Sequence, residues 1–351
     1  MADKTFMTGG TGLLGSAILE GLVKEGREVA ALCRSDESRR KLEAMGATPV
    51  TADLLDPEGL EKAMVGCDVV YHAAGLNAFC LKDRSPLFQV NVQGSLNVVE
   101  AALRLGVRRM VYTSSAATLG EKSRTVGRED SMHRGWFLSE YERSKYEAES
   151  AVMNRARSKG LELVCVNPSS VQGPGRAGGT AKIIVYYVTG RLKYFVNTRF
   201  SLVDIDDCTR GHLLAEAKGR PWNRYVLNSG TISAIDALGV MARITGVKYV
   251  PRFVPGRLAI GGAAVAANVL RMRQALSSGS QDGHDQAPPV CSEMVRTLVH
   301  GHAYDGSRAA RELGLEYTPI EDTLERTVRW LIDEGEIPPP PSYTGELEPK
   351  D

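Results

Sequence analysis

The glycine-rich stretch near the amino terminus limits the possible folds more than any other feature of the chain. An apolar run from Thr5 to Thr8 leads into Gly9-Gly10-Thr11-Gly12-Leu13-Leu14-Gly15, and a helical pattern follows from Ser16 to Glu25. A strand, a glycine turn and a helix in this order form the context in which backbone N–H groups cradle a pyrophosphate. The stretch therefore predicts dinucleotide binding by Gly9, Thr11, Gly12, Leu13, Leu14 and Gly15.

Strands and helices alternate after this turn. Strands are expected at Glu28 to Cys33, Pro49 to Ala52, Val69 to His72 and Arg109 to Thr113, with helices between them. Such alternation predicts an α/β fold with a doubly wound parallel Rossmann sheet, whose ligand lies at the carboxyl ends of the strands. At those ends we expect the cofactor to contact Asp53, Leu54, Ala73, Ala74, Gly75 and Thr113. His72 lies inside an apolar strand and is interpreted as a core residue.

The residues after the second strand bear on the choice of nicotinamide cofactor. A carboxylate at this position would bind the adenosine ribose and repel a 2′-phosphate, but the chain has Arg34-Ser35, with Arg39 and Arg40 nearby. Arg34 therefore favours NADP(H), while NAD(H) stays possible because these arginines can also be solvated surface residues.

Tyr141 and Lys145 form the candidate catalytic pair. Residues four apart lie on one face of a helix, and a lysine beside a phenol favours the phenolate. The tyrosine would then serve as a general acid or base for an alcohol or carbonyl. Ser115 ends the strand before this helix, so its hydroxyl can face the same cleft. Each feature alone also fits an ordinary polar surface.

Charge and cysteine usage exclude several classes. Lys plus Arg is 43 and Asp plus Glu is 42, for a net charge of +1. This balance gives no basic surface for nucleic acid. The six cysteines contain no Cys-x-x-Cys pair, and the histidines show no zinc spacing, so no metal site is expected. Scattered thiols, no signal peptide and no apolar run long enough for a membrane span predict a cytoplasmic protein.

Together these motifs resemble the extended short-chain dehydrogenase/reductases. The resemblance rests on the order Gly9-x-x-Gly12-x-x-Gly15, Asn91, Ser115 and Tyr141-x-x-x-Lys145, and it extends into Val203 to Asp207 and Asp305 to Gly314. It implies that Lys145 also binds the nicotinamide ribose and that Asn91 supports the lysine through water. It further implies that Pro168, Ser169 and Ser170 border the nicotinamide.

Two further segments, Val111 to Ala116 and Val166 to Gly175, look like dihydroflavonol reductases and 3β-hydroxysteroid dehydrogenases, and also like hopanoid-associated sugar epimerases. The expected function is interconversion of a ketone or aldehyde and an alcohol on an apolar or bulky substrate. A nucleotide-sugar epimerase or dehydratase with tightly bound NAD is the first alternative, although Arg199 to Val203 lacks the usual epimerase pattern. A non-catalytic NAD(P) sensor is the second.

The expected domain organisation is discontinuous. Residues 1–172, rejoined by about 204–229, form the cofactor domain; residues 173–203 and 230–335 form a smaller, mainly helical substrate lobe; and 336–351 form a tail. Trp136, Phe137, Tyr186 and Tyr187 are candidate walls of the substrate site, and Met132 and His133 are candidate gating residues. The apolar stretch Leu258 to Leu276 fits core, a dimer surface, a lipid-facing patch or a lid. The resemblance implies a homodimer through the helices at Asn91 to Leu105 and Tyr141 to Lys159.

Overall fold

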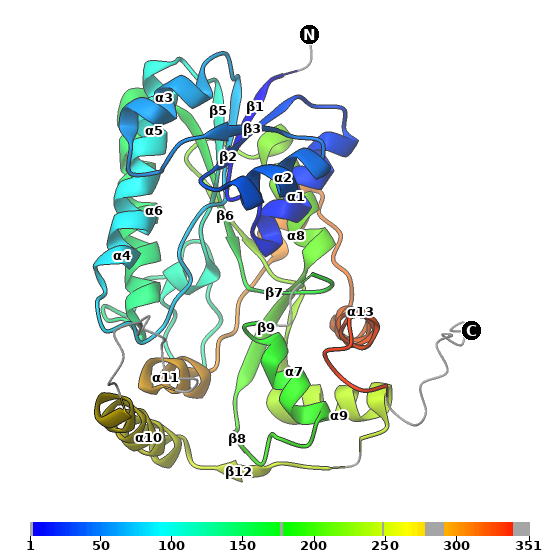
Figure 1. Ribbon diagram of the computed structural model, residues 1–351. Helices are drawn as coiled ribbons and strands as arrows, with labels where there is room; N and C mark the ends of the chain where they lie inside the picture. The colour runs from blue at the N-terminus through cyan, green and yellow to red at the C-terminus, as the bar shows by residue number, and fades with distance from the viewer. Residues whose placement is uncertain (1–2, 176–177, 248, 278–290, 340–351) are drawn as a thin grey trace, which may run out of the picture.

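The computed structural model describes residues 3–175, 178–247, 249–277 and 291–339. A large sheet with helices on both faces forms the upper part in Figure 1, and smaller sheets with helices form the lower part. The tail predicted at 336–351 lies mostly outside the described residues, which end at Pro339.

The large sheet has seven parallel strands in the order β10-β6-β5-β4-β1-β2-β3. Its register places Thr5 opposite both Val29 and Val69, so β1 lies between β2 and β4. Buried apolar side chains line most strands on both faces, as expected of a parallel sheet that helices cover. The strands are β1 Thr5–Thr8, β2 Val29–Cys33, β3 Thr48–Thr51, β4 Val69–His72, β5 Arg109–Thr113, β6 Glu162–Pro168 and β10 Arg224–Leu227.

Two helical layers cover this sheet. Helices α1 (Leu13–Lys24), α2 (Asp36–Ala44) and α8 (Ile205–Lys218) pack on one face, and α3 (Pro57–Met64), α5 (Ser95–Arg104) and α6 (Glu140–Lys159) pack on the other (Figure 1). Side chains cap several of these helices: Ser35 accepts the N–H of Ser38, and Ser139 accepts that of Glu142. The Rossmann architecture predicted from the sequence is confirmed.

The lower part is built on a sheet of β7 (Ser170–Gln172), β9 (Arg199–Asp204) and β11 (Gly230–Ser233). A separate parallel pair joins β8 (Tyr194–Val196) to β12 (Arg252–Val254). The hydrophobic core of the lower part includes Leu202, Met241 and Leu331. The predicted helical carboxyl-terminal region is present as α7 Ala181–Val188, α9 Ala234–Thr245, α10 Gly256–Ser277, α11 Ser292–His300, α12 Ser307–Leu313 and α13 Ile320–Asp333.

The apolar stretch predicted as core or surface lies in α10. Leu258 is 70% exposed and Val265 is 65% exposed, whereas Ala263 is buried. At these two positions the core interpretation is wrong, because the side chains face away from the rest of the chain. In the described part of the chain, no helix is both long and apolar enough to cross a membrane.

Candidate active site

The glycine turn lies at the carboxyl end of β1, against the end of β4. Gly9 has φ +80°, and a Cβ there would lie 2.5 Å from the backbone nitrogen of Ala74. Gly15 likewise has no room for a side chain, because a Cβ would overlap the carbonyl of Gly9. These two glycines are therefore required by the packing of the protein itself.

Gly12 differs from its neighbours because its space is open. It is the N-cap of α1, and a Cβ there would meet only the carbonyl oxygen of Gly9, at 3.4 Å. The first turn of α1 contains no acidic residue, and Thr11 and Gly12 are exposed. The helix therefore presents free backbone N–H groups and its positive dipole end to an anion, with Leu13 and Leu14 half-buried beside it.

The predicted adenosine-side residues lie at the ends of β2 to β4. Arg34 is exposed and Asp53 is partly exposed, with Nη1 and Oδ2 3.8 Å apart. Leu54 is buried beneath them. Ala73 donates its N–H to the carbonyl of Thr8 at 3.1 Å, which fixes the segment through Gly75 beside the glycine turn.

Helix α6 positions the catalytic candidates. Tyr141 is half-buried in its first turn, and the Ser115 side chain hydrogen-bonds the phenol. Burial raises the pKa of Tyr141, and the bond from Ser115 opposes that rise. Ser115 itself caps the short 3₁₀ helix Ala116–Leu119. The structure thus brings together a hydroxyl and a phenol that lie 26 positions apart in the printed sequence.

Lys145 lies one turn further along α6 and is buried. Its Nζ donates to the carbonyl of Thr113 at 2.9 Å, and it lies 5.2 Å from the centre of the Tyr112 ring. Burial lowers the pKa of Lys145 to about 8. The contact to Thr113 was not expected from the sequence, which placed the ammonium beside the phenol.

Asn91 is buried in a π-helix, Gln89–Gly94, rather than in the regular helix predicted from Asn91 to Leu105. Its side chain accepts from the N–H of Leu76 at 2.7 Å and donates to Ser144 Oγ at 2.9 Å. A Cβ on Gly75 would lie 3.3 Å from Asn91 Oδ1 and 3.8 Å from Lys145 Nζ. Asn91 therefore lies close to Lys145, and the π-helix directs its side chain toward the site.

The segment after β6 completes this edge of the site. The N–H of Ser169 donates to the carbonyl of Leu227 at 2.9 Å. Its buried Oγ has no partner among the described residues, whereas Ser170 Oγ contacts Thr180 Oγ1 at 2.9 Å. Pro168 is buried at the end of β6. An unpaired buried hydroxyl beside the sheet edge is a candidate ligand contact.

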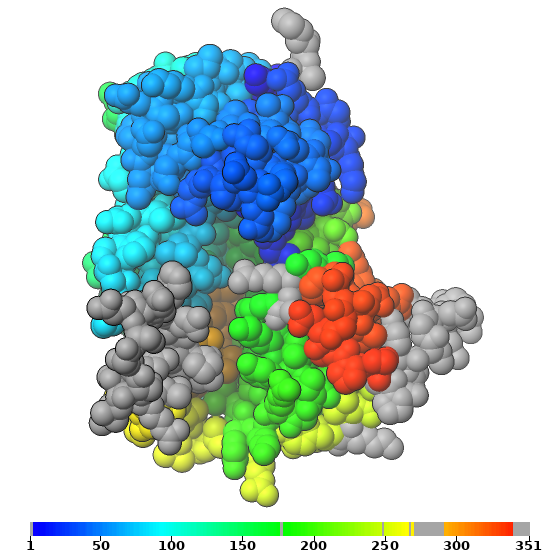
Figure 2. Space-filling model, viewed as in Figure 1, coloured from blue at the N-terminus to red at the C-terminus, as the bar shows by residue number. Residues whose placement is uncertain are grey.

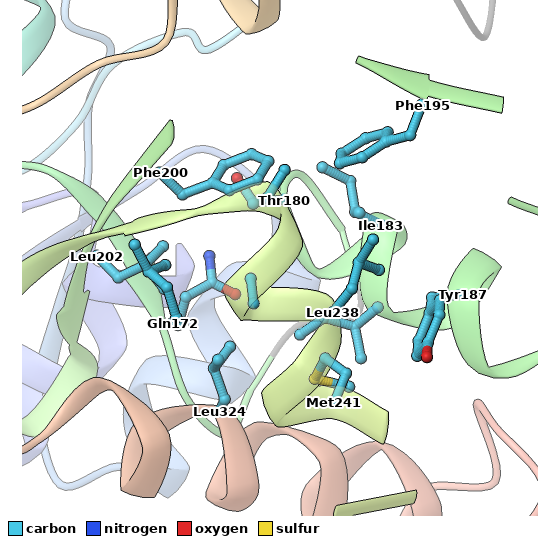
Figure 3. A pocket seen from close by; sticks show the side chains of 14 residues that line it. Gln172, Thr180, Ile183, Tyr187, Phe195, Phe200, Leu202, Leu238, Met241 and Leu324 are labelled. Carbon is cyan, nitrogen blue, oxygen red and sulfur yellow. The ribbon is translucent and has the colours of Figure 1, made fainter. Parts of the chain in front are cut away.

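A small pocket with an almost entirely apolar lining lies within the lower part of the molecule, and Figure 3 shows its lining side chains. Phe200 and Leu202 contribute from β9, Ile183 from α7, and Leu238 and Met241 from α9. Gln172 also lines it and donates to Ser170 Oγ at 3.0 Å, which links the pocket to the segment after β6.

The predicted substrate walls divide in the structure. Tyr187 lines the pocket, whereas Tyr186 is 39% exposed. Trp136 is 54% exposed and lies edge-on to His300, and Phe137 packs against His133. The sequence missed Phe79, whose ring centre lies 5.5 Å from that of Tyr141. The space-filling view is hollowed between the cyan segments near α4 (Ser85–Phe88) and the green segment of α7 (Figure 2).

His72 is confirmed as a core residue. Its ring bonds Thr8 Oγ1 at 2.6 Å and Ser95 Oγ at 2.9 Å. Burial lowers the pKa of His72 to about 3, so the ring is neutral near pH 7.

Another polar group was not found from the sequence. Glu121, His300 and His302 converge, with Glu121 Oε1 2.6 Å from His302 Nδ1 and 3.5 Å from His300 Nε2. Burial disfavours the ionised form of Glu121, but the two imidazoles outweigh it and lower the pKa of Glu121 to about 2. Sequence spacing could not reveal this group because only His300 and His302 are neighbours.

The interpretation of the cysteines as scattered single thiols is wrong for two of the six. Cys80 and Cys291 form a disulfide, while Cys33, Cys67, Cys165 and Cys208 are buried and free. The two bonded residues are 211 positions apart, so only the fold reveals that their side chains meet.

A nucleotide-binding Rossmann domain with a serine, tyrosine and lysine at its ligand edge defines a nicotinamide-dependent dehydrogenase or reductase. Residues 5–227 match the NAD dependent epimerase/dehydratase family. The chain belongs to this family of extended short-chain dehydrogenase/reductases, and it is an NAD(P)-dependent oxidoreductase acting on CH–OH and C=O groups.

Relatives and solved structures extend this similarity over most of the chain. A putative dihydroflavonol 4-reductase of Synechocystis sp. is 32% identical over 345 residues, covering 96% of this chain and 97% of the relative. Cinnamoyl-CoA reductase 1 of Petunia hybrida is 26% identical, and the match covers 95% of this chain and 93% of the relative. The crystal structure of gox2253 has a TM-score of 0.80 at 27% identity, covering 95% of this chain and 99% of gox2253. UDP-glucose 4-epimerase of Thermotoga maritima shares the fold, with a TM-score of 0.73 at 20% identity. The match covers 94% of this chain and 99% of the epimerase.

Proposed function

We propose that this protein is an NADP(H)-dependent oxidoreductase that interconverts a ketone or aldehyde and an alcohol on an apolar or bulky organic substrate. The observation that carries the proposal is the convergence of Ser115, Tyr141 and Lys145 beside the glycine turn. A hydroxyl, a phenol and an ammonium at one sheet edge provide a hydrogen bond, a proton and a positive charge for carbonyl chemistry.

The residues present fit a dinucleotide. Open space at Gly12, at the start of α1, suits a pyrophosphate. Gly75 has no side chain, so its backbone leaves space beside Asn91 and Lys145 for the cofactor. The unpaired Ser169 hydroxyl would meet the nicotinamide end. When bound, the cofactor supplies or accepts the hydride.

The protein's own groups handle the proton and the oxygen. Because burial raises its pKa, Tyr141 keeps its proton near pH 7 and can donate it to the substrate oxygen in the reducing direction. Ser115 hydrogen-bonds the same oxygen as negative charge develops on it. Lys145, fixed by Thr113, would hold the ribose hydroxyls, and Asn91 and Ser144 keep that part of α6 in place.

The pocket favours an apolar substrate group. Phenylalanine, leucine, isoleucine and methionine side chains dominate its lining, and Gln172 links it to the segment that borders the nicotinamide site. The similarity to proteins named dihydroflavonol 4-reductase and cinnamoyl-CoA reductase supports a ketone or aldehyde on a bulky organic molecule.

Arg34 supports the preference for NADP(H). Its guanidinium is 73% exposed, and its nearest acidic partner is Asp53 at 3.8 Å, so it can turn toward a 2′-phosphate. Arg39 instead donates to Thr51 Oγ1 at 2.6 Å and is held at the end of β3.

The experiment follows absorbance at 340 nm with NADPH or NADH offered against aldehydes, flavonoid-type ketones and ketosteroids. We expect NADPH oxidation that falls about 10²–10⁴-fold in Tyr141→Phe, which removes the proton donor and keeps the ring. Arg34→Ala should narrow the preference for NADPH over NADH. If Tyr141→Phe oxidised NADPH as fast as the parent protein, the proposed role of Tyr141 as proton donor would be contradicted.

The same preparation separates the alternatives. Inactivity across the panel, together with NAD that copurifies and binding of a uridine or guanosine diphosphate, would favour the nucleotide-sugar epimerase or dehydratase. A biological effect that Tyr141→Phe leaves unchanged would favour the non-catalytic sensor.

A further inference from the structure

A cluster of two imidazoles and a carboxylate lies where the carboxyl-terminal segment crosses the edge of the Rossmann domain. One ligand atom from each of Glu121, His300 and His302 lies within 4.8 Å of the other two. Glu121 follows the 3₁₀ helix that begins after Ser115, whereas His300 is the last residue of α11 and His302 follows that helix. The cluster therefore joins two parts of the chain that are distant in sequence.

Two polar atoms of this cluster are buried without a hydrogen-bond partner in the described part of the chain. The Glu121 side chain is 1% exposed and that of His300 is 4% exposed. Nevertheless Glu121 Oε2 and His300 Nε2 have no hydrogen-bond partner among the described residues. Two buried, unpaired polar atoms in one place are costly, and a bound cation would satisfy both.

Hydrogen bonds from neighbouring elements already hold the segment from His302 to Tyr304 in position. The carbonyl of His302 accepts from Ser201 Oγ at 3.3 Å, and the N–H of Gly127 donates to the carbonyl of Ala303 at 2.8 Å. Tyr304 Oη contacts His302 Nδ1 at 2.8 Å. The segment is thus fixed to β9 on one side and to the loop after Glu121 on the other.

We propose that Glu121, His300 and His302 bind a divalent transition-metal ion of the zinc class, which fastens the carboxyl-terminal segment to the Rossmann domain beside the active site. Two histidines and one carboxylate are a donor set that zinc uses with a further position open to water. Ligand atoms around one zinc lie about 3.3 Å apart, close to the separation of Glu121 from His300. Glu121 Oε1 and Tyr304 Oη both contact His302 Nδ1, so both contacts would lengthen when that nitrogen binds the ion. The His302 side chain is 19% exposed.

Local charge is compatible with a cation. The nearby guanidinium of Arg134 forms a buried ion pair with Glu142, so its charge is already balanced. Its Nη1 also donates to the backbone carbonyl of Glu121 at 3.3 Å, which leaves the Glu121 carboxylate to the histidines.

The test is calorimetric titration of untagged, chelator-treated protein with zinc chloride, and separately with magnesium chloride. We expect one zinc site per chain and no comparable magnesium binding, since imidazole nitrogens favour zinc. Glu121→Gln, His300→Asn and His302→Asn should each weaken zinc binding by more than about 100-fold, because loss of a direct ligand exceeds the 10–100-fold effect of outer-shell changes. Zinc should raise the melting temperature of the parent protein but not of these variants.

His133→Asn is the matched control, because His133 is a partly exposed histidine outside the cluster. It should bind zinc as the parent does. Absence of zinc binding by the parent protein would overturn the proposal whatever the variants do. Binding that survives all three ligand substitutions would also overturn it, since the zinc would then be held at adventitious sites. Neither readout depends on the reductase reaction.

Discussion

At the scale of single residues, the glycine turn separates the needs of the fold from those of the cofactor. Gly9 has positive φ and contacts the backbone of Ala74, so Gly9→Ala should cost about 1–3 kcal/mol of unfolding free energy. Gly12→Ala meets no protein clash and should change stability by less than about 1 kcal/mol, yet weaken NADPH binding. Urea denaturation and fluorescence titration measure the two effects. Normal NADPH affinity in a folded Gly12→Ala protein would contradict the phosphate role.

Lys145 predicts a pH dependence of cofactor binding. Its folded pKa of about 8 lies below the ordinary lysine value, so the ammonium is charged at pH 7 and loses its proton as pH rises through that value. NADPH affinity should therefore decrease above about pH 8, because a neutral amine holds the ribose less well. Lys145→Met should remove this pH-dependent decrease in affinity. Lys159→Met changes a lysine at the exposed end of the same helix and should retain the decrease. A decrease of equal size in Lys145→Met would assign the titration to another group.

At the scale of elements, a buried ion pair fixes the start of α6. The Arg134 and Glu142 side chains are 2% and 3% exposed, and Glu142 also accepts the N–H of Leu138 at 2.8 Å. Glu142→Gln would leave Arg134 buried without a counter-charge, so we expect a loss of about 3–5 kcal/mol in urea denaturation. Glu147→Gln, which breaks the exposed pair with Arg143, should cost less than about 1 kcal/mol. Similar losses in both variants would refute this explanation.

Local spacing explains which elements could be predicted. The strand, glycine turn and first helix, and the helix that presents Tyr141 and Lys145, follow from periodicity and short motifs within the sequence. The π-turn at Gln89–Gly94 could not be predicted, because its side-chain pattern also fits a regular helix. The Lys145 bond to Thr113 depends on how α6 packs against β5, which no short motif records.

At the scale of the whole molecule, the features that sequence reasoning missed join distant segments. Glu121 meets His300 and His302, and Cys80 meets Cys291. Both contacts involve the segment from Cys291 to Tyr304, which contacts the Rossmann domain as well as the lower sheet. The homodimer through α5 and α6 and the domain boundaries stay predictions, because they concern relations between whole units that no local pattern determines.

The Cys80–Cys291 disulfide should make stability and active-site order depend on redox conditions. It fixes the start of α11 to the loop that carries Phe79, which packs on Tyr141, and the N–H of Cys80 donates to Glu293 Oε2 at 2.8 Å. A bond across so long a loop restricts the unfolded chain, so reduction should lower the unfolding free energy by about 2–4 kcal/mol.

Urea denaturation with and without a phosphine reductant measures this difference, after a thiol count in denaturant shows whether four or six cysteines are free. Cys291→Ser should unfold like the reduced protein and ignore the reductant, whereas Cys67→Ser should keep the full response. Loss of the bond also frees the loop beside Tyr141, so KM for the carbonyl substrate should rise together with the loss of stability. A parent protein with six free thiols and no response to reductant would show that Cys80 and Cys291 remain reduced, and the carboxyl-terminal segment would then be held by its hydrogen bonds and the Glu121 cluster alone.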